Sequence, residues 1–260
     1  GDFGDLLDTW LDEGLSHVAE EVVGMRLRGA APRQNLGFDE AGGGTEAFDA
    51  YFLQNLLRLG IYQRNPSDTR TLSSSDPGGL ESLEMRGFAW SFLRWLADTR
   101  LPDGSGGFLG GPREEELFRA LAGGGPERLT GVDNLLRALE QVTGERPAWG
   151  ELVAEFSPVA HVDDDVADVP GRFTFPSWDL RDALPEVSTR TGHFSGYPLR
   201  FTDAGFDPTA YEFEVRGSAQ AYFRFASSGP APSFSLELSN RLGGPVPASA
   251  EPQITVVRVR

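Results

Sequence analysis

Three side chains of the kind that bind metal ions recur near the start of the sequence. Glu13, His17 and Glu20 stand at i, i+4 and i+7, which places them on one face of a helix. Gly14 follows Glu13, and a glycine inside a helix costs about 1 kcal/mol relative to alanine, so it usually marks a close approach by another group. One straight helix rarely encloses a metal by itself. The pattern therefore predicts either one ligand of a shared metal site or ordinary helix carboxylates paired with arginine.

The stretch from Trp10 to Glu21, WLDEGLSHVAEE, resembles the second zinc-binding motif of the gluzincin metallopeptidases. Aminopeptidase-type members usually carry W-L-N-E-G-F-A followed by an aromatic residue and a Glu, and thermolysin-like members carry N-E-G-x-S-D. The residues that match the first form are Trp10, Leu11, Glu13, Gly14 and, more loosely, Glu20. Asp12 stands where the family usually has Asn. His17 stands where thermolysin-like members have an Asp that orients a ligand histidine.

The resemblance implies that Glu13 is the third protein ligand of a catalytic Zn²⁺. In this class the other two ligands come from an H-E-x-x-H helix, whose Glu is the general base for the zinc-bound water. The histidines of this sequence are His17, His161 and His193, and none of them lies in such a motif. We therefore expect the chain to be the C-terminal part of a zinc peptidase that lacks its histidine helix, which the family places upstream, and to be inactive as an isolated fragment.

Other candidate residues rest on placement alone. Gluzincins usually supply a downstream Tyr or His that stabilises the oxyanion as water attacks the peptide carbonyl. Tyr51 and Tyr62 are candidates by placement, although the expected role of each is that of a core or rim aromatic. Arg86 is predicted either to bind a substrate carboxylate or to pair with Glu84 or Asp98. His17 is predicted to orient a partner or to lie at the surface.

The elements that must position these residues are predicted to be helices up to about residue 160. Apolar residues recur at helical spacing in the ranges 5–27, 45–62, 80–99, 114–122, 132–143 and 149–156. Gly29 and Gly144 follow two of these ranges as helix-ending glycines. Segments 86–98 and 131–144 are also similar to the helical subdomain of exported bacterial peptidases of the hyicolysin-like type, so the family resemblance covers roughly residues 5 to 160.

The remainder is predicted to be rich in strands. Apolar residues alternate at Tyr211–Val215, Ala221–Phe225, Phe234–Leu238 and Ile254–Val259, with Gly and Pro between the runs. The expected fold class is α+β: a helical part of a metallopeptidase domain at 1–162, an acidic linker at 163–170, and a small antiparallel β sandwich or sheet at 171–260. The linker's aspartates lack the spacing of a calcium-binding EF-hand loop.

Composition excludes several classes of function. A net charge of −16 argues against nucleic acid as a partner, because phosphate binding requires a basic surface. The absence of cysteine excludes a disulfide scaffold and a thiolate metal site. No apolar run approaches the roughly 20 residues of a membrane span. The sequence begins with Gly1 rather than Met, so the lack of a signal peptide is uninformative.

Two functions follow. The first is a secreted or cell-envelope zinc peptidase whose partners are a peptide or protein substrate and the missing N-terminal catalytic segment. The alternative is a non-catalytic exported pseudopeptidase or binding module, which uses the β-rich tail to recognise protein or carbohydrate. Exposed aromatic residues such as Trp178 or Tyr197 are expected to serve that recognition.

Overall fold

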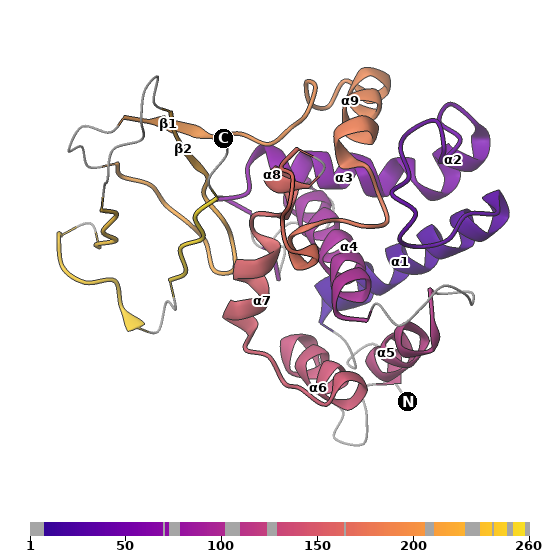
Figure 1. Cartoon of the computed structure of the whole chain (residues 1–260), viewed down its shortest axis with the longest axis horizontal. Helices are drawn as coiled ribbons and strands as arrows, with labels where there is room; N and C mark the ends of the chain where they lie inside the picture. The colour runs from indigo at the N-terminus through magenta and orange to yellow at the C-terminus, as the bar shows by residue number, and fades with distance from the viewer. Residues whose placement is uncertain are drawn as a thin grey trace.

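The computed structural model describes residues 8–69, 71–72, 79–101, 110–123, 129–163, 165–205, 211–226, 235–240, 242–248 and 252–257. Its helices are α1 (Thr9–Arg28), α2 (Glu46–Tyr51), α3 (Leu53–Arg64), α4 (Leu80–Arg100), α5 (Pro112–Gly123), α6 (Gly131–Thr143), α7 (Trp149–Phe156), α8 (Val159–Val162), the short 3₁₀ helix η2 (Gly171–Phe173) and α9 (Leu180–Thr191). Two strands, β1 (Thr202–Ala204) and β2 (Phe223–Phe225), follow them. The fold is α+β in the coarse sense, with helices predominating (Figure 1).

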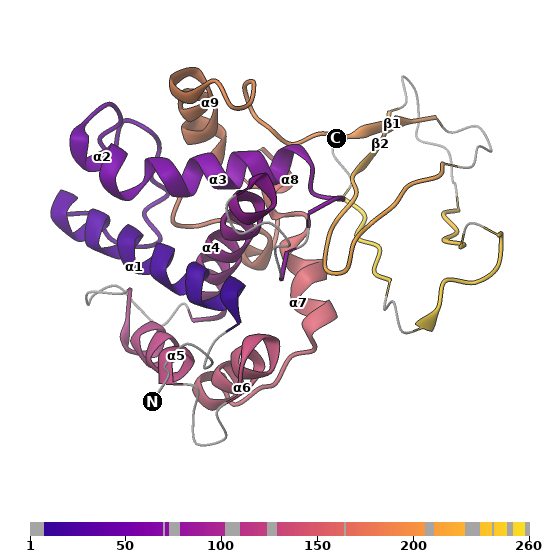
Figure 2. The same cartoon turned by 180° about the vertical axis from the view of Figure 1, so that it is seen from behind.

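Helix α4 lies at the centre of the helical part. Residues 87–98 of this helix are buried on every side, as expected for a helix that is apolar around most of its circumference. Helices α1 and α3 both pack along α4, and α9 packs against α3 (Figures 1 and 2). In the part of the chain that the structure describes, no helix has both the length and the apolar character needed to cross a bilayer.

The predicted helices upstream of residue 160 are largely confirmed. α1, α4, α5, α6 and α7 occupy the expected ranges to within a few residues, although the predicted start of the first helix at Asp5 falls outside the described residues. Gly29 and Gly144 end α1 and α6 with φ values of 69° and 79°. This left-handed conformation is open to glycine at little cost, which is why both residues signalled a helix end.

The prediction of one continuous helix over residues 45–62 is wrong. Phe52 has φ −121° and ψ −38° and separates α2 from α3. Its ring is buried and meets the Trp178 ring edge-on at 5.2 Å. Gly24 of α1 permits this packing, because a Cβ at Gly24 would lie 2.7 Å from Phe52 Cε1. The break thus lets α2 close over α1 while α3 follows α4.

The prediction of strands directly after residue 170 is also wrong, because helix α9 lies there. The Asp179 side chain caps its start by accepting a hydrogen bond from the Asp182 N–H. The buried positions of α9 follow helical spacing and are Leu180, Ala183, Leu184 and Val187. Pro185 lies inside the helix and obscured this pattern, since proline ordinarily interrupts a helix interior. The helical core therefore extends well past residue 170.

The tail is not an antiparallel sandwich in the residues described. β1 and β2 form a two-stranded parallel sheet in which Thr202 pairs with Phe223 and Ala204 pairs with Phe225. Of the predicted strand runs, the one at 221–225 contains β2, whereas 211–215 and the described parts of the other two, 235–238 and 254–257, contain no strand. Phe234, Arg258 and Val259 of those runs lie outside the described residues. Alternating apolar residues indicate an extended backbone but do not determine which segment it pairs with.

Part of the tail's backbone bonds to the helical part instead of to another strand. The N–H groups of Arg216 and Gln220 donate to the carbonyls of Ser67 and Pro66, just beyond α3. The Trp149 indole donates to Ser218 Oγ at 2.9 Å. The N–H groups of Arg216 and Gln220 are therefore not available to pair with another strand, which helps to explain why the expected sandwich does not form.

The acidic segment at 163–170 begins inside the core. Asp163 is buried, and its Oδ1 accepts a hydrogen bond from the Phe175 N–H at 2.6 Å. Asp165 forms an ion pair with Arg181 of α9 at 3.5 Å. Asp163 is therefore not part of a solvated linker, because its carboxylate fixes the chain that leads into η2 and α9.

Candidate functional site

The predicted zinc ligand, Glu13, lies on the first half of α1. Its neighbours Trp10, Leu11 and Val18 are buried, so α1 is held by its apolar face while the opposite face reaches solvent. The Glu13 side chain is 25% exposed. The carboxylate is therefore fixed in place by the helix but remains accessible from outside.

Gly14 is explained by helix packing. A Cβ at this position would lie 2.8 Å from Leu93 Cδ1 and 3.1 Å from Ala89 Cβ, both on α4. The group that approaches α1 at this glycine is thus the central helix. Gly14 sets the distance between α1 and α4 and, with it, the depth at which the preceding Glu13 sits.

A second glycine brings two arginines together beside α1. A Cβ at Gly87 of α4 would lie 2.2 Å from the backbone oxygen of Arg58 on α3, so the two helices cross with their backbones almost touching. Arg86 precedes this glycine, and the guanidinium groups of Arg58 and Arg86 are consequently neighbours. Burial, and then the like charge of Arg86, lower the pKa of Arg58.

Glu13 forms an ion pair with one of these arginines. Its Oε1 lies 2.8 Å from Arg86 Nη2, and its Oε2 lies 3.7 Å from His17 Nε2, beyond hydrogen-bond distance. Asp98, one of the partners expected for Arg86, instead pairs with Arg94 at 2.8 Å. The arrangement matches the simpler sequence expectation for Glu13, a helix carboxylate paired with arginine. Among the described residues, the second oxygen, Oε2, has no partner closer than His17 Nε2.

His17 is 5% exposed and uses both ring nitrogens. Nε2 lies 2.8 Å from Arg58 Nη1, and because a guanidinium can only donate, Nε2 must be the acceptor. We therefore assign the proton to Nδ1, which donates to Glu20 Oε2 at 2.9 Å. Burial lowers the pKa of His17 despite the opposing hydrogen bond to Glu20. In this arrangement His17 is a neutral linker between Glu20 and Arg58.

The side chains that the structure describes do not form a complete metal site. Among the described residues, no group of three or more His, Asp or Glu side chains is placed to hold a metal ion. Catalytic zinc requires three protein ligands. The cluster offers Glu13 Oε2, whereas both nitrogens of His17 are occupied. Glu13 thus fits a zinc ion as a single monodentate ligand, and further ligands have to come from elsewhere.

The two tyrosines predicted as oxyanion donors are engaged in helix packing. Tyr62 is buried in the core, where burial raises its pKa well above the ordinary value, and its ring meets Phe88 edge-on at 5.6 Å. Tyr51 packs against Gly24 of α1. Gly24 is three helical turns from Glu13, about 16 Å along the axis. Tyr51 therefore packs far along α1 from Glu13, and the buried Tyr62 is not open to a substrate from outside.

Sequence reasoning missed a second charged group, which is sealed in the core. Arg94 forms ion pairs with Asp98 at 2.8 Å and with Glu114 of α5 at 2.7 Å, and Arg33 reaches Glu114 at 2.9 Å. Its sequence signal was the Arg94–Asp98 pair at i, i+4 within an otherwise apolar helix. Arg58, by contrast, had no local signal, because its role depends on the crossing of α3 and α4.

Glu21 extends the sealed group toward the later part of the chain. It is fully buried, and its Oε1 accepts a hydrogen bond from the Trp178 indole at 2.6 Å. Burial raises the pKa of Glu21 to about 7. Trp178 is itself fully buried and Tyr197 is partly buried, so neither is the exposed recognition aromatic that the sequence suggested.

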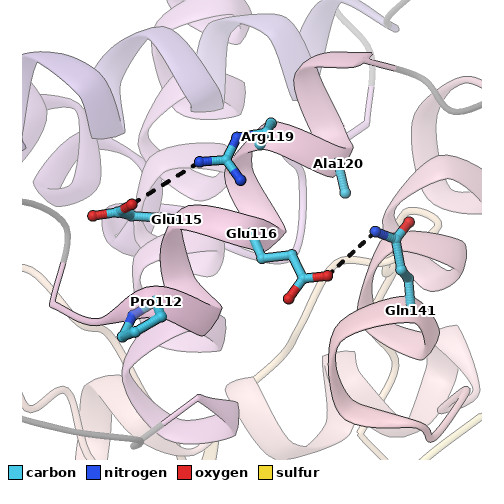
Figure 3. A pocket seen from close by; sticks show the side chains of 6 residues that line it. All are labelled: Pro112, Glu115, Glu116, Arg119, Ala120 and Gln141. Carbon is cyan, nitrogen blue, oxygen red and sulfur yellow. Dashed lines mark hydrogen bonds and ion pairs between the residues drawn. The ribbon is translucent and has the colours of Figure 1, made fainter.

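A shallow hollow lies between α5 and α6. Pro112, Glu115, Glu116, Arg119, Ala120 and Gln141 line it (Figure 3). Its polar side chains engage one another: Arg119 lies 4.0 Å from Glu115, and Gln141 donates to Glu116 at 3.5 Å. The hollow presents no buried polar group that a ligand would satisfy, so the Glu13 cluster is the better candidate site.

We compared the chain with known proteins to seek an independent assignment. No family model, no curated protein and no solved structure matches it.

Proposed function

We propose that this chain supplies the third zinc ligand, Glu13, to an exported peptidase that hydrolyses peptide bonds. The observation that carries the proposal is the state of the Glu13 carboxylate: one oxygen is engaged by Arg86, while Oε2 is 3.7 Å from His17 Nε2 and the side chain is 25% exposed. The likeness of residues 10–21 to the gluzincin motif, with Glu13-Gly14 at its centre, provides the second support.

The chain's own residues would hold and orient one ligand. Helices α1, α3 and α4 fix Glu13 at the rim of a buried core, with Oε1 toward Arg86 and Oε2 toward His17. A bound zinc ion would supply a water of lowered pKa as the nucleophile. The two imidazoles have to come from a segment that is not in this sequence, since none of its histidines lies in an H-E-x-x-H motif.

Zinc binding by the natural protein, including any segments that flank these 260 residues, tests the proposal. We expect Glu13→Gln to weaken Zn²⁺ binding and to abolish casein hydrolysis, because an amide oxygen carries no charge to offer the metal. The matched control is Glu115→Gln, an acid-to-amide change at the hollow on α5. Equal zinc affinity for the Glu13→Gln variant and the unaltered protein would contradict the proposal.

The gene provides a simpler test. An H-E-x-x-H encoded roughly 20 to 60 residues ahead of this sequence is the arrangement that the motif requires.

The isolated chain is expected to bind zinc more weakly than micromolar and to show no turnover of casein. Recovery of the protein from the cytoplasm rather than the medium or cell envelope would contradict export.

One observation favours the alternative, a non-catalytic recognition module. The tail exposes a group of aromatic rings in which Phe213 lies 4.9 Å and Tyr211 lies 6.2 Å from Phe223. Both Phe213 and Tyr211 are more than a third exposed. Replacing both by Ser is expected to abolish binding to polysaccharide or protein if this function holds, without altering zinc affinity. Unchanged binding would remove the support for a recognition role.

A further inference from the structure

The segment that leads into α9 is held to α1 and α4 by two buried carboxylates. In residues 174–179, called here the Trp178 segment, the Trp178 indole donates to Glu21 Oε1 at 2.6 Å, and the Ser177 N–H donates to Asp98 Oδ2 at 3.1 Å. We propose that this segment is a pH-dependent latch, which stays closed while Glu21 is neutral and opens when Glu21 ionises. The inference is independent of any metal at the rim of α1.

Trp178 covers the Glu21 carboxyl group. Both side chains are 0% exposed, and the Trp178 ring also meets Trp90 of α4 at 6.4 Å. Backbone hydrogen bonds attach the segment to the turn after α1: the N–H groups of Asn35 and Leu36 donate to residues 176 and 177. Since α1 and α4 are long packed helices, displacement of this short segment is the least disruptive way to bring water to Glu21.

The charges beside Glu21 balance without it. Two guanidinium groups and two carboxylates pair with one another there, namely those of Arg94, Arg33, Asp98 and Glu114. Among the described residues, no guanidinium donates to Glu21, and its Oε2 is enclosed without a hydrogen bond. An ionised Glu21 would therefore be a surplus charge in the core, and an uncompensated buried charge is costly. The neutral form is the one that fits the closed structure.

The carboxyl groups of α4 and α5 differ from Glu21 in their partners. Burial raises the pKa of Glu114 as well, but guanidinium groups lie 2.7 and 2.9 Å from its two oxygens. Asp98 lies 2.8 Å from Arg94. Within the described part of the chain, Glu21 is thus the member of this group that lacks a close cation.

Titratable groups on α1 and on the segment itself point elsewhere. His17, one turn before Glu21, is bonded to Glu20 and Arg58, and burial lowers its pKa, so its charge appears toward low pH and acts in the opposite direction. Asp179 turns to the start of α9, where it accepts the N–H of residue 182. Neither supplies a charge that would hold Glu21 ionised.

The direction of the pH effect follows from the two states of the latch. Burial raises the pKa of Glu21 from 4.5 to about 7, with Arg94 acting against it. An open latch returns the carboxyl group to water and to its ordinary pKa. The closed state therefore binds the proton more tightly, so opening becomes easier as the pH rises from about 4.5 to 7 and then levels off. The ratio of open to closed molecules should increase by up to about 300-fold, which corresponds to the difference between the two pKa values.

Hydrogen exchange of the full chain between pH 4.5 and 8 tests the latch. The amides of Leu36, Ser177 and Asp179 report opening, because their hydrogen bonds join the segment to its neighbours. Comparing the unaltered protein with Glu21→Gln at each pH cancels the intrinsic effect of pH on exchange. We expect opening to rise by up to about 300-fold in the unaltered protein and to stay constant in the variant. Glu115→Gln, an acid-to-amide change on α5, is the matched control and should keep the rise.

The amides of residues 135–139 in α6 distinguish a local opening from unfolding of the whole core. If they follow the same pH profile as Leu36 and Asp179, the whole core responds to pH and the latch is wrong. Parallel profiles for Glu21→Gln and the unaltered protein also overturn the inference.

A second variant tests the charge balance and decides the question if Glu21→Gln fails to fold. Glu114→Gln leaves one positive charge in excess beside Arg94, so Glu21 should ionise in the closed structure at lower pH. The rise in opening between pH 4.5 and 7 should consequently shrink. A rise of the original size in Glu114→Gln would overturn the inference.

Discussion

Two charged groups lie along α1 and α4, and they differ in access to solvent. Glu13, Arg86 and Arg58 meet at the rim of the helical part, where Glu13 and Arg86 are each about one quarter exposed. Arg94, Asp98 and Glu114 are completely enclosed. Sealed ion pairs are costly to break and cannot meet a ligand, whereas pairs at a rim contribute little stability and can exchange partners. The comparison indicates that one group supports the fold and the other is available for function.

The largest effect should come from cutting the chain at residue 170. This removes Trp178, the partner of Glu21, together with core residues of α9 such as Leu184. We expect the shortened protein to lose cooperative thermal unfolding and most of its helical circular dichroism. A chain ending at residue 200 keeps these contacts and should remain folded. If the chain ending at 170 unfolds as cooperatively as the longer one, the sealed group does not depend on the later segment.

Breaking the sealed group by Arg94→Met should lower the free energy of unfolding by about 3–5 kcal/mol, because Asp98 and Glu114 would remain buried, with Arg33 as their remaining cation among the described residues. Urea denaturation measures the loss. Arg119→Met, at an exposed ion pair on α5, is the control and should change stability by less than about 0.5 kcal/mol. Similar losses in the two variants would remove the distinction between sealed and rim charges.

The sealed group also predicts how stability depends on pH. Burial raises the pKa of Glu21 from 4.5 to about 7, with Asp98 acting in the same direction while Arg94 and the indoles of Trp178 and Trp90 oppose it. The folded state therefore holds the proton more tightly than the unfolded state. The contribution of Glu21 to stability is fully present below about pH 4.5 and decreases as the pH rises toward 7.

Urea denaturation of Glu21→Gln and the unaltered protein between pH 4.5 and 8 isolates this contribution. The unaltered protein should lose stability with rising pH relative to the variant, by up to about 3 kcal/mol. The difference cancels the opposite trend from His17, whose lowered pKa makes folding more favourable as pH rises. Parallel pH profiles for the two proteins would show that Glu21 does not titrate in this range.

The rim group should be sensitive to the helix crossing that places it. Gly87→Ala forces a Cβ against the backbone oxygen of Arg58, 2.2 Å away, so we expect a loss of about 1–3 kcal/mol and weaker zinc binding by the natural protein. Gly14→Ala should cost less, because its closest contact is the flexible end of Leu93. Gly123→Ala, with open space around its Cβ, is the control. A stability change in Gly87→Ala no larger than in Gly123→Ala would contradict the close crossing.

The smallest effect on stability is expected at Glu13 itself. Replacing Glu13 by Gln breaks a partly exposed ion pair, which should lower the free energy of unfolding by about 0–1 kcal/mol without metal. Thermal unfolding of the metal-free protein measures it. A loss as large as that of Arg94→Met would mean that Glu13 is a structural residue, and the contrast between the two groups would disappear.

The accuracy of the sequence predictions depended on the range of the interactions involved. α1 and α6 were predicted well because periodicity and the end glycines Gly29 and Gly144 act within a few residues. The tail was predicted poorly, since alternation at Phe213 and Val215 does not specify a pairing partner and both side chains remain more than a third exposed. Helix α9 was not predicted, and Pro185 lies inside it, where proline ordinarily interrupts a helix.

The sequence by itself determined the helical character of the first 160 residues and marked Glu13-Gly14 as an unusual pair of residues in a helix. Only the tertiary structure decided which groups these two residues contact. It showed that Gly14 accommodates α4, that Arg86, 73 residues later in the sequence, is the partner of Glu13, and that Arg58 engages His17. Such contacts depend on how helices cross, and the crossing depends on the shape of the whole buried surface.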